Sequence, residues 1–259
     1  MTPALPLVSI VTVTYNAGRF LERTMESVFG QTYPCIEYLI IDGGSTDETL
    51  AIIRKYEDKL AYWHSKKDNG TYDAMNQGIQ MAQGETLLML NAGDWIEPRA
   101  IEQMIDHTQA KVTDRLIACD WTVFFNPDKT PVTRRVSFAF DQIVGVCHQG
   151  ILIGKSIYAQ FGMYDTSLRF LADYDFYLRV WKKNPKAFIH VPLFLTHYRF
   201  EGMTTEHTLR SNIERWTVIN RHFAWYEATT IKTVTLSAIV IRSLYKYLPN
   251  RNERIYHRE

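Results

Sequence analysis

The sequence has few cysteines and no long apolar run, and its charges almost cancel. Cys35, Cys119 and Cys147 are odd in number and widely spaced, so they predict neither a disulfide framework nor a metal site and favour a reducing cytoplasm. No apolar run reaches the roughly 20 residues of a transmembrane helix, and the first residues lack the basic start of a signal peptide. The 29 basic and 28 acidic residues leave a net charge of +1, which argues against nucleic acid as the main partner.

Three kinds of active-site motif are also missing. No Gly-x-Gly-x-x-Gly follows a strand-like run, which disfavours a dinucleotide-dependent dehydrogenase. Residues 14–19 read Thr-Tyr-Asn-Ala-Gly-Arg where a nucleotidyltransferase would carry a glycine-rich phosphate loop with a basic residue. No Ser-His or Cys-His arrangement suggests a covalent nucleophile. The 259 residues, 46% of them hydrophobic, suffice for one substantial α/β domain or for a domain with a tail.

The segment LIIDGGSTD, residues 39–47, is central to the predicted fold. Its short apolar run without polar alternation predicts a strand buried on both faces. Gly43 and Gly44 allow a sharp turn, and Ser45 with Glu48 forms a capping box that predicts a helix over 47–56. Asp42 therefore ends a parallel strand, at the edge where open α/β sheets bind ligands, and can accept hydrogen bonds from a ribose or a base. The alternative, that Asp42 only caps the turn, stays open.

Strand-like and helical patterns alternate along the chain. This alternation predicts right-handed crossovers and a mostly parallel sheet flanked by helices. Asn16 and Gly84 are expected to cap helices. The predicted strands cover 7–13, 39–41, 60–64, 86–90, 115–125, 132–140, 151–153 and 187–195, and the predicted helices 19–29, 47–56, 72–83, 156–161 and 175–183.

Two further acids stand where chemistry is expected. Asp94 follows the strand at 86–90, at the same sheet edge as Asp42. A divalent cation that binds a diphosphate needs one or two carboxylates, which Asp94 fits, although it could instead cap a helix starting near Pro98 together with Glu97. Asp173 opens a helix in apolar company, where an acid can act as a general base or as an N-cap.

Two later segments carry basic residues. The loop at 197–204 contains His197 and Arg199, and it could close over a bound diphosphate or simply pack on the surface. The segment 231–248 has a helical pattern and several Lys and Arg residues. It could lie on an anionic membrane surface, pack on the domain, or form a homodimer contact.

Five motifs stand out along the chain. They are VSIVTVTYN (8–16), SVFGQTYPCIEYLIIDGGSTDET (27–49), DNGTYDAMNQGI (68–79), GETLLMLNAGD (84–94) and LADYDFYLR (171–179). Together they resemble family 2 glycosyltransferases of the GT-A fold, in the bacterial branch that builds capsules, exopolysaccharides and lipopolysaccharides. The match covers about 5–205, so we expect a GT-A domain over 1–205, with a nucleotide-sugar half (1–115) and an acceptor half (116–205), followed by a helical extension over 206–259.

The resemblance implies a role for each matching position. Asp94 would hold Mg²⁺ or Mn²⁺, although the upstream acid of the family's Asp-x-Asp motif is Ala92 here. Asp173 would be the catalytic base, and His148-Gln149 would begin the acceptor region. Donor-binding roles fall on Thr14, Tyr15, Asn16, Asp42, Asp68, Asn76, Asn91 and Arg199.

The implied reaction is an inverting displacement that moves a sugar from a nucleotide-diphosphate donor, a UDP-sugar first of all, to a hydroxyl of a saccharide or lipid-linked saccharide. The enzyme would work in the cytoplasm, in part at the inner face of the membrane. Two alternatives remain: a nucleotidyltransferase, and a non-catalytic binding module, for which Ala92 is the best support.

Overall fold

The computed structural model describes residues 5–109, 111–124, 130–136, 138, 146–199 and 209–224. The chain divides into two units, Met1–Glu214 and Arg215–Glu259, and the sheet lies in the first. The segment 231–248, predicted to be a basic helix, lies outside the described residues. Among the helices that are described, none is both long and apolar enough to cross a membrane.

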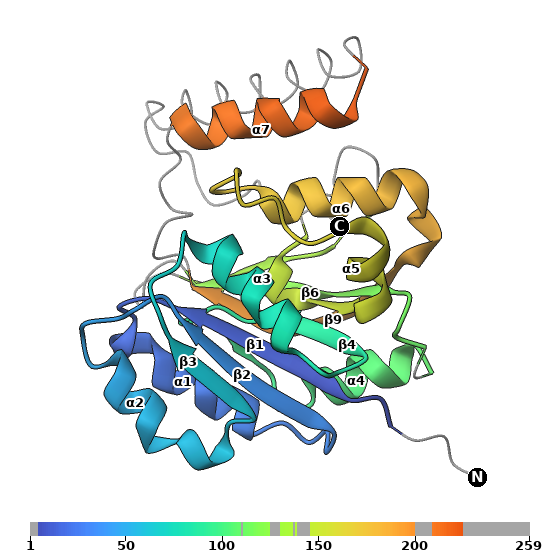
Figure 1. The fold of residues 1–259 in the computed structure, drawn as a ribbon. Helices are drawn as coiled ribbons and strands as arrows, with labels where there is room; N and C mark the ends of the chain where they lie inside the picture. Colours follow the sequence, from blue (N-terminus) through green and yellow to red (C-terminus); the bar gives the residue numbers. More distant parts are fainter. Residues whose placement is uncertain are drawn as a thin grey trace, which may run out of the picture. The chain divides into compact units, whose positions relative to one another are not determined.

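Nine strands of the described chain form one sheet, in the order β3-β2-β1-β4-β8-β6-β9-β5, with β7 paired to β6 (Figure 1). β3, β2, β1 and β4 are parallel, and β6 is parallel to β9, whereas β8, β7 and β5 are antiparallel to their neighbours. The prediction of a mostly parallel α/β sheet is therefore confirmed. The strands are β1 Val8–Thr14, β2 Ile36–Asp42, β3 Tyr62–Ser65, β4 Thr86–Met89, β5 Trp95–Ile96, β6 Leu116–Phe124, β7 Val132–Arg134, β8 Ile151–Gly154 and β9 Phe188–Arg199.

Helices cover both faces of this sheet. α1, α2 and α4 contribute to one apolar cluster with the strands, and α3, α5 and α6 lie on the opposite face (Figure 1). The helices are α1 Gly18–Phe29, α2 Thr49–Lys55, α3 Thr71–Met81, α4 Ala100–His107, α5 Lys155–Phe161, α6 Ala172–Lys183 and α7 Leu209–His222, and the short 3-10 turns are η1 Glu57–Lys59, η3 His148–Gly150 and η4 Pro185–Ala187.

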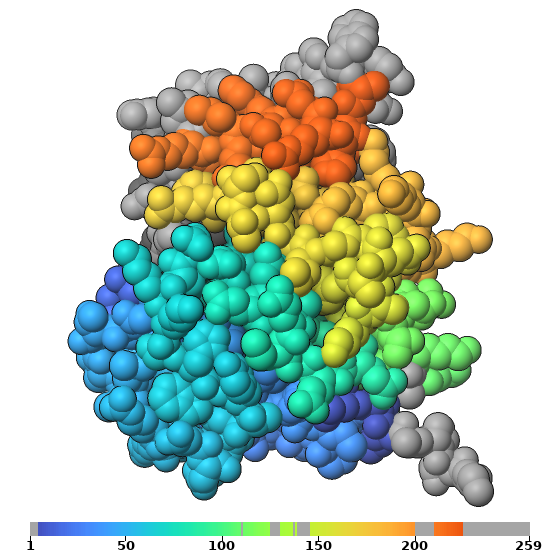
Figure 2. Space-filling view, in the orientation of Figure 1, coloured from blue at the N-terminus to red at the C-terminus, as the bar shows by residue number. Residues whose placement is uncertain are grey.

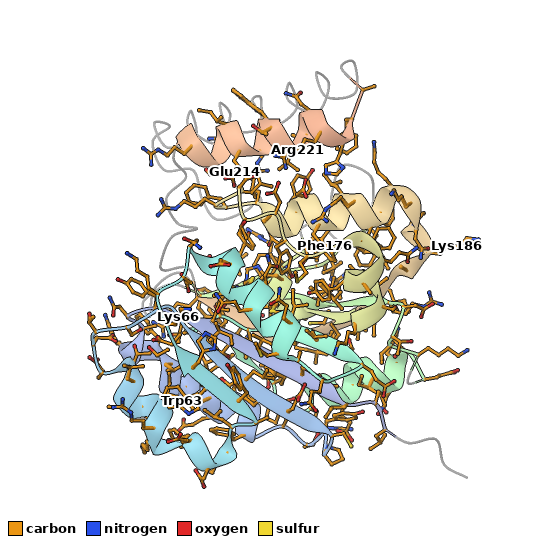
Figure 3. All side chains as sticks on the ribbon, viewed as in Figure 1. Trp63, Lys66, Phe176, Lys186, Glu214 and Arg221 are labelled. Carbon is orange, nitrogen blue, oxygen red and sulfur yellow. The ribbon has the colours of Figure 1, made fainter. Side chains whose placement is uncertain are left out.

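Successive side chains of β1 point to opposite faces of the sheet, and helices cover both faces. Ile10 joins the cluster under α1, α2 and α4, whereas Val11 faces α3. A Cβ atom on Gly78 of α3 would lie 2.3 Å from Val11 Cγ1, so only a glycine lets this helix lie so close to β1. On the same face as α3, Phe176 of α6 is fully buried among the interior side chains (Figure 3).

Three predicted helix caps are wrong, because the residues bond to other groups. The Ser45 hydroxyl donates to Asp42 instead of capping, and α2 begins only at Thr49 without a side-chain cap on Glu48. Asn16 does not cap α1, since its Oδ1 accepts the Thr46 N–H at 2.8 Å. Ala82 rather than Gly84 ends α3, and the Gly84 N–H donates to Ser9 Oγ at 2.8 Å.

The structure corrects three further expectations. Asp94 does not cap a helix with Glu97, because α4 begins at Ala100. Asp173 is not an N-cap either, since it lies in the first turn of α6, after Leu171. Residues 197–199 belong to β9 rather than to a loop, and of the expected strand at 132–140 only Val132–Arg134 pairs with β6 among the described residues.

Candidate active site

The candidate site lies at the carboxyl ends of β1, β2 and β4. Thr14 and Asp42 pair with each other as the last residues of β1 and β2. The loop after β4 carries Asn91 and Asp94. Parallel strands therefore bring these predicted residues to one edge of the sheet, where ligands of open α/β sheets bind.

Asp42 is completely buried and is satisfied by its own turn. Its Oδ2 accepts N–H groups from Gly44 and Ser45 at 3.1 and 2.9 Å and the Ser65 hydroxyl at 2.6 Å. Gly44 has a φ of 86°, which a glycine adopts without strain. Asp42 thus shapes the β2–α2 turn.

Asn16 joins the two loops that follow β1 and β2. Its N–H donates to Ser45 Oγ at 2.8 Å, and its side chain accepts from the Thr46 N–H. Asn16 has a φ of 47°, in the left-handed region that asparagine tolerates better than most residues. The neighbouring Tyr15 is 64% exposed, so its ring is open to a ligand.

Asp68 faces the end of β2 from the loop before α3. A Cβ atom on Gly43 would lie only 2.7 Å from Asp68 Oδ2, so the glycine makes room for this carboxylate. Burial first, and then the charges of Asp73 and Asp42, raise the pKa of Asp68. Thr14 Oγ1 is buried nearby on β1 and has no hydrogen-bond partner among the described residues. This edge of the sheet therefore presents the Asp68 carboxylate and the Thr14 hydroxyl as groups that could bind a ligand.

Asp94 is buried, with 4% of its surface exposed. Its Oδ2 accepts the Gln149 side-chain amide at 2.6 Å, and its Oδ1 accepts the Arg199 backbone N–H at 2.9 Å. Burial raises the pKa of Asp94 to about 7, against the opposing effect of these hydrogen bonds. Ionising Asp94 near neutral pH therefore costs free energy, because the charged carboxylate is buried.

Asp173 lies at the end of a hydrogen-bonded chain of side chains. Its Oδ2 lies 3.0 Å from His148 Nδ1, and its Oδ1 lies 2.9 Å from the Tyr72 hydroxyl. The other ring nitrogen, His148 Nε2, lies 2.9 Å from Asn91 Nδ2. Since His148 and Gln149 are consecutive in η3, one short turn links Asp173 to Asp94.

A basic and aromatic group surrounds the end of β9. The Trp95 ring stacks on His197 with centroids 5.0 Å apart, and the Arg23 guanidinium lies 3.4 Å from the Trp95 ring centroid. The Arg199 guanidinium lies 4.6 Å from the Phe20 ring centroid. Burial, and then the charge of Arg199, lowers the pKa of Arg23. Two guanidinium groups thus create positive potential near Asp94.

Asn76 does not join the hydrogen-bonded chain. Its amide donates to the Tyr164 carbonyl at 2.9 Å, and its Oδ1 accepts the Tyr164 N–H at 3.0 Å. It therefore ties α3 to the segment after α5, and these two segments meet on the molecular surface in Figure 2. Its predicted donor-binding role stays a prediction.

Two residues that support Asp173 had no signal in the sequence. Tyr72 is 101 positions away from Asp173, and only the tertiary fold brings the two together. Glu214 of α7 accepts the backbone N–H groups of Arg169, Phe170 and Leu171 at 2.6, 2.6 and 2.8 Å, directly before the helix that carries Asp173. No local sequence pattern predicts such long-range contacts.

The described residues contain no group of three or more His, Cys, Asp and Glu side chains arranged as a metal centre. Asp94 nevertheless fits a cation that takes most of its ligands from a diphosphate and water, because each of its oxygens keeps one unused lone pair. The buried Asn91 Oδ1, three residues upstream, has no partner among the described residues. The oxygen donors suit Mg²⁺ or Mn²⁺.

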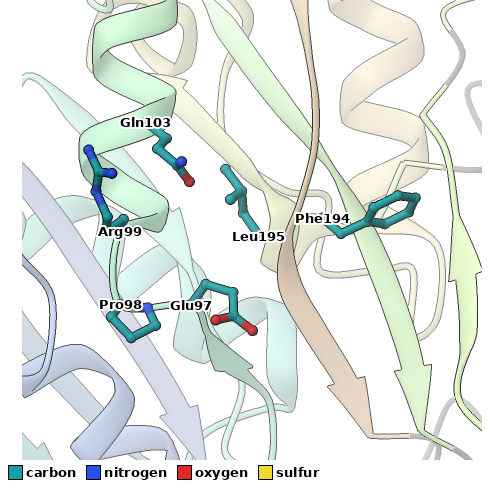
Figure 4. Close-up of a pocket in the computed structure, with 6 residues that line it drawn as sticks. All are labelled: Glu97, Pro98, Arg99, Gln103, Phe194 and Leu195. Carbon is teal, nitrogen blue, oxygen red and sulfur yellow. The ribbon is translucent and has the colours of Figure 1, made fainter.

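A cavity of about 500 Å³ lies elsewhere, between α4 and β9 (Figure 4). None of the predicted site residues lines it, and it carries only two charged side chains. Its lining residues are Glu97, Pro98, Arg99, Gln103, Phe194 and Leu195. We place the candidate site at the sheet edge, where the acids and their hydrogen-bond partners converge.

Solved structures of similar fold include two complexes with nucleotide sugars. TarS 1–349 of S. aureus, in complex with UDP-GlcNAc, has a TM-score of 0.65 and 16% identity over 89% of this chain and 71% of its own. A mannosyltransferase from Pyrobaculum calidifontis, in complex with GDP-Man and Mn²⁺, has a TM-score of 0.58 and 16% identity over 85% and 64%. These likenesses show that the fold is GT-A.

Sequence comparison shows the family. Residues 9–169 match the model of glycosyl transferase family 2. An uncharacterised glycosyltransferase of Mycobacterium tuberculosis (strain H37Rv) is 36% identical over 190 residues, which cover 69% of this chain and 70% of the relative. A PGL/p-HBAD biosynthesis glycosyltransferase of Mycobacterium bovis is 30% identical over 217 residues, or 78% and 80% of the two chains. The chain therefore belongs to glycosyltransferase family 2.

Proposed function

We propose that the protein is an inverting glycosyltransferase that transfers a sugar from a nucleotide diphosphate, a UDP-sugar first of all, to an acceptor hydroxyl. The observation that carries the proposal is the link between two acids at the sheet edge, with Asp94 joined through Gln149 and His148 to Asp173. In this proposal Asp94 acts on the leaving diphosphate and Asp173 on the attacking hydroxyl.

Asp173 acts as the general base in this reaction. The acceptor oxygen attacks the anomeric carbon, its proton passes to Asp173, and the bond from that carbon to the diphosphate breaks. The attack and the departure occur on opposite sides of the carbon, so the configuration inverts. A positioned base of this kind contributes roughly 100- to 10,000-fold in rate.

Asp94 would hold Mg²⁺ or Mn²⁺ through the lone pairs that Gln149 and Arg199 leave unused. Such a cation supplies Lewis-acid stabilisation of the departing diphosphate. Its positive charge would also favour the ionised form of a carboxyl whose pKa burial raises to about 7. The Arg199 and Arg23 guanidinium groups add positive charge at the same end of the site, which suits phosphate oxygens.

The nucleoside lies over the ends of β1 and β2 in this proposal. The exposed Tyr15 ring offers a stacking surface, and Asp68 and Thr14 offer groups for ribose or base contacts. Asp42 and Asn16 hold the two loops that present these side chains. His148 and Gln149 lie between the two acids, so an acceptor hydroxyl that reaches Asp173 passes close to them.

We extend the proposal to the biological setting. The acceptor would be a saccharide or lipid-linked saccharide of a bacterial surface polysaccharide, used at the cytoplasmic face of the membrane. The basic segment 231–248 would contact anionic lipid or a second copy of the chain. Removing 231–259 should then weaken co-sedimentation with anionic vesicles, and full binding by the truncated chain would refute the membrane contact.

A thermal-shift screen tests the donor. UDP, GDP and dTDP would each be added with Mn²⁺, with Mg²⁺ and with EDTA, because a ligand that binds only the folded state raises the melting temperature. We expect one diphosphate to stabilise the protein in a metal-dependent way. Release of that diphosphate from the matching sugar donor, with water as acceptor, then measures turnover.

The Asp173→Asn variant separates an enzyme from a binding module. An enzyme with Asp173 as base should lose on the order of 100-fold or more in turnover while the donor still shifts the melting temperature. A non-catalytic module, the reading that Ala92 favours, would bind the donor and show no turnover even in the wild-type protein. A nucleotidyltransferase would release diphosphate from a nucleoside triphosphate instead.

A further inference from the structure

The proton on His148 can be located from its partners. Asn91 Nδ2 is an amide donor and lies 2.9 Å from His148 Nε2, so Nε2 acts as the acceptor. In a neutral ring the proton then sits on Nδ1. His148 Nδ1–H therefore donates to Asp173 Oδ2 across 3.0 Å. The side chains of His148 and Asp173 are each only 16% exposed, so little water competes for this bond.

The two carboxylate oxygens of Asp173 differ in whether they have an unused lone pair. Oδ1 accepts the Tyr174 N–H at 2.8 Å and lies 2.9 Å from the Tyr72 hydroxyl. That hydroxyl also lies 3.0 Å from the Phe170 carbonyl, but the charged carboxylate is the stronger acceptor. Both lone pairs of Oδ1 are thus used. Among the residues that the structure describes, Oδ2 accepts a hydrogen bond only from His148, which leaves it one lone pair.

We propose that Asp173 Oδ2 is the atom that receives the acceptor proton, and that His148 is the positioning residue whose Nδ1–H keeps this oxygen facing the acceptor. The inference rests on the proposed function. His148 does not carry the transferred proton, because its Nδ1 already holds one. Its contact with Asn91 also connects the base to the loop that carries Asp94.

Among the described residues, the tyrosine and cysteine side chains around Asp173 do not exchange a proton near neutral pH. Burial, with the charge of Asp173 adding to it, raises the pKa of Tyr72, Tyr164 and Tyr177 well above the ordinary value. Burial, and then the charges of Asp94 and Asp173, raise the pKa of the Cys147 thiol well above its ordinary value. All four groups keep their protons over the working range. The acceptor proton therefore passes to Asp173 rather than to one of these groups.

Two substitutions separate the ring nitrogens. His148→Asn can place an amide N–H where Nδ1 lies, and His148→Gln can reach the position of Nε2 instead. We expect His148→Gln to lower kcat about tenfold or more, a part of the contribution of a positioned base, without changing the donor KM. His148→Asn should restore most of kcat.

Three outcomes overturn the inference: both variants act like the wild-type protein, both lose the same activity, or His148→Gln raises only the donor KM. A measurement that needs no turnover keeps the inference testable if a variant fails to fold. In ¹⁵N-histidine-labelled wild-type protein, the ring of His148 should be the Nδ1–H tautomer, and an Nε2–H tautomer would refute it. Failure of the proposed function has a different signature, because Asp173→Asn would then match the wild-type protein whatever residue 148 is.

Discussion

The charge on Asp94 should make the folded protein less stable above neutral pH. Burial raises the pKa of this carboxyl from 3.8 to about 7, so between these values the native state holds a proton that the unfolded chain has released. Unfolding therefore becomes easier as pH rises through this window, and the full cost is present above pH 7. Asp94→Asn removes the charge and keeps the shape.

The size of the effect follows from the pKa difference of 3.2 between 7 and 3.8. At about 1.4 kcal/mol for each pKa unit, the ionised carboxylate costs on the order of 4 kcal/mol at pH 8.5 and about 2 kcal/mol at pH 5.5. These are upper values, because the amide in the variant does not reproduce the hydrogen bonds that Gln149 and Arg199 make to a carboxylate. We expect the variant to gain roughly 2 kcal/mol more at the higher pH.

Urea unfolding with EDTA present, at pH 5.5 and pH 8.5, measures this gain. Asp58→Asn is the matched control, since Asp58 is exposed and its substitution should change the free energy of unfolding by less than about 0.5 kcal/mol. An Asp94→Asn variant that is no more stable at pH 8.5, or whose gain is the same at both values, would refute the reasoning. The same variant should lose the metal-dependent part of donor stabilisation.

Glu214→Ala removes the acceptor of three backbone N–H groups at 169–171, so we expect a loss of roughly 1–3 kcal/mol in unfolding free energy. Faster amide exchange at these residues would confirm it, and unchanged exchange would contradict it. Gly154→Ala would place a Cβ atom 2.1 Å from the Thr113 carbonyl oxygen, which should cost about 1–3 kcal/mol. Gly30→Ala, whose Cβ atom would lie 3.3 Å from its nearest neighbour, is the control and should cost clearly less in the same urea titration.

The strands at the site could be predicted because short apolar runs in the local sequence mark them. The apolar run 39–41 and the run 86–90 both lie in buried strands that pair in parallel with β1. β2 ends at Asp42, and the loop after β4 carries Asp94 at the same sheet edge. A strand buried on both faces is mostly apolar along its length, so its sequence pattern does not depend on which element packs on it. The sequence does not show that β8 runs antiparallel to β4, because a short apolar run does not reveal the direction of the neighbouring strand.

Side-chain partners could not be predicted in the same way. Ser45 has the spacing of a capping box, but Asp42 lies nearer after the turn and takes its hydroxyl. His148 reaches Asp173 across 25 positions, from a 3-10 turn that has no hydrophobic period. Such contacts depend on which loops the fold brings together, and motif resemblance supplied only the residue types.

The environments of the two acids distinguish their roles. Asp94 is buried with one donor on each oxygen, so its negative charge is poorly compensated and a cation would relieve it. Asp173 has three donors around it, from His148, Tyr72 and the Tyr174 backbone, so its carboxylate is stabilised as an anion without a metal. Two carboxylates in different surroundings can take different parts in catalysis. This contrast supports our proposal that Asp94 serves the leaving diphosphate and Asp173 the acceptor hydroxyl.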